Sequence, residues 1–382
     1  MTAWHIAGGQ VLRDASLAAG DVALGGGRIA GAPPAGAALF DASGLLVLPG
    51  IVDIHGDAHE RAQEPRPGVA FPVPMALADS ARQCLSAGIT TAYLGVTLSW
   101  EPGLRSIEAF RAWLAALDRR PAGTDLRVHL RFEADNLDAM DEACAAIAGG
   151  RVHLLGFNDH TPGILRRLDD AKQMAKYAGR AGMPADAFRD LALRVAARRG
   201  DVPAGRSRMA EAARRAGIPM LSHDDATVED RHGFRALGAT ICEFPMAESV
   251  AEEARAAGEH VVMGAPNVVR GGSHLGWASA APLAERGLVT VLASDYHWPA
   301  LFEAPFRLAD RGVLSLAQAW ALVSANPAAA LGLSDRGAIA EGRRGDLVLA
   351  DPAARAPVAV FVAGELAWLA PGAASRLAAQ AA

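Results

Sequence analysis

Between residues 49 and 336, short apolar runs alternate with stretches of helical pattern. The apolar runs are continuous rather than alternating with polar positions, which is typical of parallel strands buried on both faces. Strands alternating with helices indicate an α/β fold, and eight strands favour a closed (β/α)8 barrel (a TIM barrel) over an open sheet. The predicted strands span residues 50–55, 90–95, 127–133, 152–157, 219–223, 240–244, 260–264 and 290–295.

The two ends of the chain have a different pattern. Residues 1–48 are short apolar runs punctuated by glycine, and residues 345–351 and 358–364 are similar. Such runs predict small β-strands joined by tight turns. We therefore expect a small β-sandwich domain built from residues 1–48 and 337–382, beside a TIM barrel over residues 49–336. The charged helical stretch from about 165 to 215 is expected to be an insertion over the barrel mouth.

Composition and charge narrow the range of partners. Hydrophobic residues make up 51% of the 382 residues and charged residues 21%, so the chain can bury a large core and wholesale disorder is excluded. The net charge of −5 gives no global attraction to nucleic acid or to anionic lipid, so we expect neither as a partner. A homodimer remains open as an alternative to a monomer.

Cysteine usage and hydropathy bear on the compartment. Cys84, Cys144 and Cys242 are an odd number of cysteines without CxxC spacing, which favours a reducing compartment. The sequence shows no basic segment followed by an apolar one at its start, and no uncharged apolar run of roughly 18 residues. We expect a soluble, cytoplasmic protein.

Side chains that bind metals lie at the carboxyl ends of several predicted strands. In a barrel these ends converge on one rim, so residues far apart in the sequence can bind the same ion. A single histidine at a strand end is more often structural than a ligand, but three histidines and three carboxylates, none in mid-strand, are hard to explain that way. Imidazole nitrogens with carboxylate oxygens suit transition metals. The candidate ligands are His55, Asp57, Glu133, His160, His223 and Asp295.

Several motifs resemble those of a known superfamily. Residues 48–55, Leu-Pro-Gly-Ile-Val-Asp-Ile-His, resemble the opening of amidohydrolase-superfamily barrels, and residues 325–328 with 342–348 resemble their return to the small β domain. More specific matches are Glu60-Arg61 with residues 64–68, then residues 159–163, 222–227 and 266–274. Together these resemble the PhnM family of the carbon–phosphorus lyase pathway for phosphonate use. The resemblance implies hydrolysis of α-D-ribose 1-methylphosphonate 5-triphosphate to the 5-phosphate and pyrophosphate.

The resemblance also implies two divalent transition-metal ions, with zinc as the first expectation and manganese, iron or nickel as alternatives. His55, Asp57 and Asp295 would bind one ion, and His160 and His223 the second. Many relatives bridge the ions with a carbamylated lysine, but the only lysines here, Lys172 and Lys176, lie in a helical stretch, so Glu133 is the candidate bridge. Asp295 would act as the catalytic base that deprotonates the attacking water.

A phosphorylated sugar as the small-molecule substrate needs cationic and polar partners. Arginines and backbone N–H groups beside glycines are suited to phosphate. The predicted phosphate-binding residues lie in the loops that resemble the family's own: Arg66, Asn267, Arg270, Ser273 and His274.

Two other functions share this fold and are kept as alternatives. One is hydrolysis of a C–N bond by a deacetylase, cyclic amidase or deaminase, which would use the same metal platform. Arg66 and Arg270 discriminate, because a triphosphate pocket should be lined with cations. The other is a non-catalytic amidohydrolase-like scaffold, against which the presence of all six candidate ligands argues.

Overall fold

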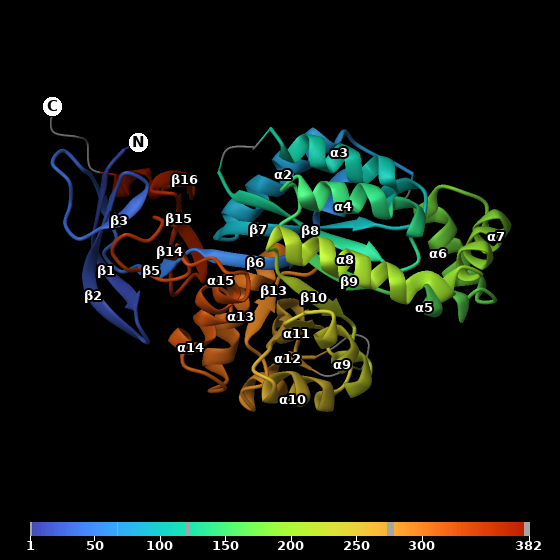
Figure 1. Ribbon diagram of the computed structural model, residues 1–382. Coiled ribbons are helices and arrows are strands. Elements are labelled where there is room, and N and C mark those ends of the chain that lie inside the picture. The colour runs from blue at the N-terminus through green and yellow to red at the C-terminus, as the bar shows by residue number, and fades with distance from the viewer. Residues whose placement is uncertain (1, 67, 120–122, 273–278, 378–382) are drawn as a thin grey trace.

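A computed structural model describes residues 2–66, 68–119, 123–272 and 279–377. Within them, two separate sheets are formed (Figure 1). The small sheet lies at one end of the molecule and carries both chain termini, whereas the larger sheet and its helices make up the rest.

The larger sheet consists of parallel strands in sequential order, from β6 to β13. Helices lie between successive strands, so the predicted (β/α)8 barrel is confirmed. The predicted strand positions agree with the observed ones to within a few residues, β7 excepted, which extends further at its carboxyl end. The strands are β6 (Ile51–Gly56), β7 (Ile89–Leu98), β8 (Asp125–Glu133), β9 (Leu154–Asn158), β10 (Met220–His223), β11 (Ile241–Glu243), β12 (His260–Gly264) and β13 (Val291–Ala293).

The barrel closes between its first and last strands. Gly56 and Asp295 form a parallel bridge, and the backbone N–H of Asp295 donates to the carbonyl of His55 at 2.9 Å. The backbone N–H of Asp57 donates in turn to the carbonyl of Asp295, also at 2.9 Å. Closure therefore places the ends of β6 and β13 directly beside each other.

The barrel interior is mainly apolar below its rim, and the fully buried His129 of β8 is a polar exception there. One buried cluster takes residues from alternating positions of the strands, which is the layered packing expected inside a closed barrel. A second, larger cluster fills the space between the strands and the surrounding helices. Polar side chains that reach the interior are consequently concentrated at the strand ends. The interior cluster includes Val52, Ile54, Tyr93, Leu154, Leu221, Ile241, Val262 and Val291.

Helices surround the barrel, and sequence signals mark where some of them begin. Helix α9 (Val228–Ala236) starts after Thr227, whose hydroxyl accepts from the backbone N–H of Asp230 while the Asp230 carboxylate accepts from that of Thr227. The other helices around the barrel are α1 (His59–Gln63), α2 (Val73–Ser86), α3 (Ile107–Leu117), α4 (Met140–Ala148), α8 (Val202–Ala216), α10 (Glu248–Ala256), α11 (Ala265–Arg270), α12 (Ala280–Glu285), α13 (Trp298–Asp310), α14 (Leu316–Ala321) and α15 (Ala325–Ala330).

The predicted insertion between β9 and β10 is helical. It comprises α5 (Thr161–Leu165), α6 (Ala171–Ala181) and α7 (Ala185–Ala196), which lead into α8. These helices have a small hydrophobic cluster of their own, separate from the barrel core. Helices α6 and α7 lie at the end of the molecule remote from the small sheet (Figure 1).

The small sheet joins strands from both termini, as predicted. Its order is β16-β15-β14-β5-β1-β2-β3, with β4 paired to β1. One cluster, in which Phe361 contacts both Trp4 and Phe40 edge to face, packs these strands together. The strands are β1 (Trp4–Arg13), β2 (Ser16–Gly25), β3 (Arg28–Ala30), β4 (Ala38–Asp41), β5 (Leu46–Pro49), β14 (Leu347–Asp351), β15 (Ala356–Val362) and β16 (Glu365–Leu369).

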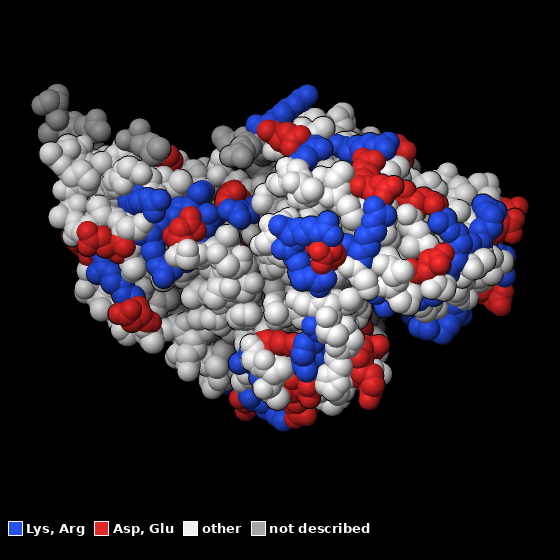
Figure 2. Space-filling model, viewed as in Figure 1, with Lys and Arg blue, Asp and Glu red and all other residues white. Residues whose placement is uncertain are grey.

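The surface carries charges of both signs. On the face shown in Figure 2, basic and acidic side chains lie next to one another over much of the barrel. Surface ion pairs of the described residues include Arg111–Glu142 and Arg151–Asp118. Among the described residues, no helix is both long and apolar enough to cross a membrane.

Candidate metal centre

Three groups of potential metal ligands meet at the carboxyl ends of the strands. Within each group, one ligand atom per residue lies within 4.8 Å of the others. The structure thus brings five of the six predicted ligands into these groups, together with two acids that the sequence analysis did not single out, Asp224 and Glu243. The groups are His55, Asp57 and Asp295; His160, His223 and Asp224; and His55, His223 and Glu243.

The first group depends on a glycine between two of its members. A Cβ atom on Gly56 would lie 2.8 Å from Nε1 of Trp298 and 2.9 Å from the Ser294 hydroxyl, so only glycine fits between His55 and Asp57. Asp295 has a positive φ of 55°, a strained backbone conformation for a residue other than glycine. Burial and then the charge of Asp57 raise the pKa of Asp295 to about 7.

The second group lies across the barrel ends of β9 and β10. His160 precedes α5 and His223 ends β10, and their ring centroids are 5.6 Å apart. Oδ2 of Asp224 lies 3.5 Å from Nε2 of His223. Asp224 also has a positive φ, of 59°, and its burial raises its pKa.

The residues of the motif around His223 have two roles: some face the site, and the others hold the loop in place. Ser222 donates to Asp225 at 2.7 Å, and the fully buried Arg231 donates to both of these residues. Ser222 and Asp225 therefore fix the loop, whereas His223 and Asp224 face the other ligands.

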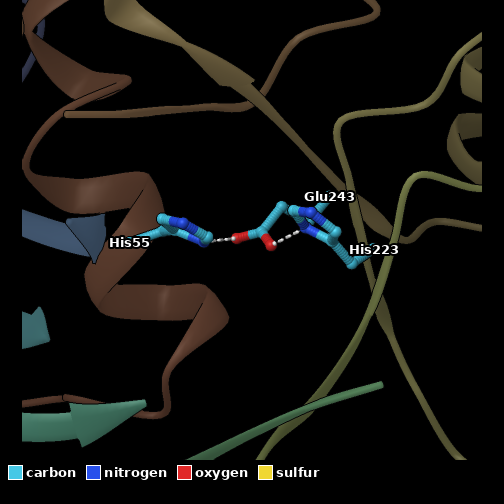
Figure 3. Close-up of side chains that lie close together, drawn as sticks. All are labelled: His55, His223 and Glu243. Atoms are coloured by element: carbon cyan, nitrogen blue, oxygen red, sulfur yellow. Dashed lines mark hydrogen bonds and ion pairs between the residues drawn. The ribbon is translucent and has the colours of Figure 1, made fainter. Parts of the chain in front are cut away.

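Glu243 joins the first two groups. Its Oε1 lies 2.8 Å from Nδ1 of His55 and its Oε2 lies 2.7 Å from Nδ1 of His223 (Figure 3). The two rings are stacked, 5.9 Å apart and 12° from parallel. Glu243 is completely buried, and burial raises its pKa. Its position at the end of the sixth barrel strand is the signal by which the sequence could have identified it.

The candidate bridging acid, Glu133, lies behind His160. Its carboxylate contacts Nδ1 of His160 and accepts from the backbone N–H of His160 at 3.1 Å. Burial opposes the charged form of Glu133, but His160 outweighs it and holds the pKa at about 2. Glu133 belongs to none of the three groups found among the described residues, and its bridging role stays a prediction.

An arginine that the sequence analysis passed over reaches the same centre. Arg131, on β8, is only 5% exposed; its guanidinium lies 3.4 Å from Oδ2 of Asp57 and 3.2 Å from Nε2 of His223. Burial, and then Arg131, lowers the pKa of His55 to about 3. Neutral imidazoles are the form that binds metals. The sequence signal for Arg131 was its alternation with His129 and Glu133 along one strand, which places all three side chains on the same face.

A buried amide completes this end of the barrel. Asn158 is the register partner of Glu133, is 1% exposed, and has no hydrogen-bond partner for either side-chain polar atom among the described residues. A buried amide without partners is costly, so this position is suited to a bound polar molecule.

These donors fit a divalent transition-metal centre. In His55, His160 and His223, Nδ1 contacts a carboxylate of Glu243 or Glu133, so Nε2 is the nitrogen that remains to bind an ion. At His223 this nitrogen also lies 3.2 Å from the guanidinium of Arg131, which would have to turn away when an ion binds there. A carboxylate behind a ligating histidine is a common arrangement at metal sites, since it fixes the ring and its tautomer. The donor set of nitrogens and oxygens matches the preferences of zinc and its neighbours.

The predicted phosphate-binding residues differ in how close they lie to the metal centre and in what they contact. A Cβ on Gly264 would lie 3.4 Å from Oδ2 of Asp295 and 3.7 Å from Nδ2 of Asn267, so Asn267 lies beside the site. Arg270 is exposed and its guanidinium donates to the hydroxyl of Tyr296 at 3.2 Å, next to Asp295. Arg66 is exposed, and among the described residues its side chain makes no hydrogen bond or ion pair. Ser273 and His274 lie outside the described residues.

Comparison with known proteins agrees with the fold and identifies the family. The chain belongs to the amidohydrolase family, which its sequence matches over residues 46–367. Within that family it is similar to α-D-ribose 1-methylphosphonate 5-triphosphate diphosphatase of Escherichia coli (strain K12). The two are 33% identical over 303 residues, which cover 76% of this chain and 79% of the relative. The resemblance deduced from the motifs is therefore confirmed.

Solved structures share the fold across nearly the whole chain. An amidohydrolase from an environmental sample of the Sargasso Sea has a TM-score of 0.67 at 15% identity, covering 96% of this chain and 93% of that one. A β-aspartyl dipeptidase from the thermophilic Fervidobacterium islandicum AW-1 has a TM-score of 0.62 at 17% identity, covering 96% of both. At these identities the likeness establishes the architecture alone.

Proposed function

We propose that this protein is a metal-dependent diphosphatase of phosphonate catabolism, which hydrolyses α-D-ribose 1-methylphosphonate 5-triphosphate to the 5-phosphate and pyrophosphate. The observation that carries the proposal is the similarity to the E. coli diphosphatase over about three quarters of both chains. We further propose that the first two ligand groups, His55 with Asp57 and Asp295 and His160 with His223 and Asp224, hold two divalent ions, with zinc as the first candidate.

The position of Arg131 supports phosphoryl chemistry. Its guanidinium lies among the ligand groups, within 3.4 Å of both Asp57 and His223. A polyphosphate brings several negative charges to the reacting centre, and an arginine in a water-poor site can bind phosphoryl oxygens with two hydrogen bonds. A neutral amide would have no such use for a buried cation.

The reaction needs a nucleophile, a base and charge neutralisation. The divalent ions would acidify the attacking water and neutralise charge on the phosphoryl oxygens. Asp295 takes a proton from that water while the water oxygen forms a bond to phosphorus. The anhydride bond between the first and second phosphoryl groups then breaks, and its electron pair leaves with pyrophosphate. Because pyrophosphate is a good leaving group, positioning and charge neutralisation contribute most.

Polar groups beside Asp295 would hold the phosphate chain. The amide of Asn267 faces the same point as the Asp295 carboxylate, and Arg270 reaches the adjacent Tyr296. Both follow β12 and therefore lie on the rim where the substrate enters. The unpartnered amide of Asn158 provides a further group for an oxygen of the substrate or of water.

A substrate comparison tests the proposal. The metal-loaded enzyme is assayed with a ribosyl 5-triphosphate, a simple phosphodiester and neutral amides, and pyrophosphate release is measured directly. We expect the triphosphate to have the highest kcat/KM. A preference for an amide would replace the proposal with C–N hydrolysis. Absence of turnover on all of them with metal bound would favour the scaffold alternative.

A further inference from the structure

We propose that Glu243 is a positioning residue that locks His55 and His223 in the same tautomer and so couples the two metal positions. The inference rests on the metal centre of the proposed function but not on its substrate. It starts from one buried carboxylate that contacts one imidazole from each of the two ligand groups (Figure 3).

The two contacts have the geometry of hydrogen bonds. A metal ion shared by an imidazole nitrogen and a carboxylate oxygen would lie roughly 2.0–2.2 Å from each, which separates the two atoms by about 3.4 Å at tetrahedral angles. The observed separations from Glu243 are 2.8 Å to Nδ1 of His55 and 2.7 Å to Nδ1 of His223. Glu243 therefore lies behind the ligands rather than among them.

These hydrogen bonds determine where the imidazole protons are. The ionised Glu243 carboxylate has no hydrogen to donate, so with Glu243 charged both Nδ1 atoms carry the proton. Each Nε2 then keeps its lone pair and can bind an ion. His55 does so together with Asp57 and Asp295, and His223 together with His160 and Asp224.

The surroundings of Glu243 hold this arrangement in place. The next residue, Phe244, has a φ of +53° and packs against both rings, with centroids 5.4 Å from His55 and 5.5 Å from His223. The backbone carbonyl of Glu243 accepts from the N–H of Asp224 at 3.0 Å. The loop after β11 thus supports both imidazoles at once.

Glu243→Gln is the sharpest perturbation because it keeps the length of the side chain. Glutamine has one acceptor oxygen and one NH2 group, so it can accept from only one Nδ1–H. The other imidazole would have to face the NH2 group with an unprotonated Nδ1. Its proton would move to Nε2, and that histidine could no longer bind an ion.

Metal stoichiometry is the primary measurement. Metal-free protein is reloaded with Zn2+, dialysed and analysed by elemental analysis, with folding checked by circular dichroism and Tm. We expect about two ions in the wild type and about one or fewer in Glu243→Gln. Asp346→Asn is the control, because this buried acid accepts from Arg344 and from the backbone N–H of Ala363 and contacts none of the candidate ligands, so it should keep about two ions.

A second measurement needs no variant of Glu243. In metal-free wild type labelled with 15N-histidine, both His55 and His223 should carry their proton on Nδ1; the resonances are assigned with His55→Gln and His223→Gln. Either ring protonated on Nε2 would overturn the inference, as would two ions bound by Glu243→Gln with wild-type affinity. A wild type that binds two ions but does not cleave the triphosphate would refute the proposed diphosphatase and leave this inference standing.

Discussion

The carboxylate of Asp53 accepts two hydrogen bonds from Ser294, one from its backbone N–H at 3.0 Å and one from its hydroxyl at 2.6 Å. The two residues are 241 positions apart in the sequence, and both are fully buried. This contact joins β6 to the end of β13, one residue before Asp295. Closure of the barrel and assembly of the first ligand group are therefore the same structural event.

Ser294→Ala should weaken that closure. The substitution leaves the buried Asp53 carboxylate with one acceptor site unsatisfied, which typically costs about 1–3 kcal/mol. We expect a lower Tm and weaker metal binding by the first ligand group, measured by thermal unfolding and by metal titration. Ser80→Ala is the control, because its buried hydroxyl donates to the helical carbonyl of Ala76 and supports no ligand. Equal effects of the two substitutions would contradict the structural role assigned to Ser294.

Asp295→Asn tests the catalytic base. The amide oxygen can still occupy the position of the carboxylate, but it cannot accept the proton of the attacking water. General-base catalysis contributes about 10²–10⁴-fold, so kcat should fall by that order while the fold is retained. Steady-state kinetics with metal content measured on the same preparation separates loss of the base from loss of an ion. A variant with near wild-type kcat would show that another residue takes the proton.

Much of the fold could be predicted because strands buried in the barrel appear in the sequence as apolar stretches. Most of the barrel strands are apolar runs, and β7 is buried over its whole length, from Ile89 to Leu98. The exception is β8, in which polar and apolar residues alternate. The ligand candidates follow from the same pattern, since polar residues at strand ends interrupt it. A pattern along the chain was enough to place His55 and Asp295 on one rim.

The contacts across the barrel could not be predicted in the same way. Glu243 and Arg131 act through residues on other strands, and those neighbours are defined only once the barrel has closed. Arg131 was one arginine among many in a sequence with few lysines. For Glu133, the sequence could place the carboxylate at the rim but could not show that it faces His160.

Arg270→Ala tests the phosphate-binding prediction. A charge-assisted hydrogen bond between arginine and phosphate contributes about 1.5–3 kcal/mol, so its loss should raise KM for the triphosphate roughly tenfold to a hundredfold. The KM for a neutral amide should change little. Arg111→Ala is the control, because Arg111 is a surface residue paired with Glu142 on the helices around the barrel. Equal KM values for the triphosphate in wild type and Arg270→Ala would remove this residue from the substrate site.

The last prediction concerns stability at the opposite end of the barrel, where Asp125 begins β8. Its Oδ2 accepts from Arg336 at 2.7 Å and from Arg127 at 3.1 Å, and Arg336 also donates to Thr91 at 2.8 Å. Burial opposes the ionisation of Asp125, but the two guanidinium groups outweigh it and hold the pKa of this carboxyl below its usual value. The ion pairs connect the barrel to the segment that returns to the small sheet.

The pKa of Asp125 is lower in the folded state than in the unfolded one. Its contribution to the free energy of unfolding is therefore fully present above the pKa of the unfolded state, about 3.9. This contribution is lost as the pH falls through the lower pKa that Asp125 has in the folded protein. Asp125→Asn should therefore reduce the free energy of unfolding by about 1–3 kcal/mol near neutral pH, and the difference from wild type should shrink below pH ~4. Thermal unfolding of both proteins from pH ~7 to ~3.5 measures how the difference in their stability depends on pH. Asp118→Asn, at an exposed pair with Arg151, should cost at most about 1 kcal/mol at any pH. A gap between Asp125→Asn and wild type that stayed constant with pH would mean that the ionised carboxylate is not what stabilises the contact.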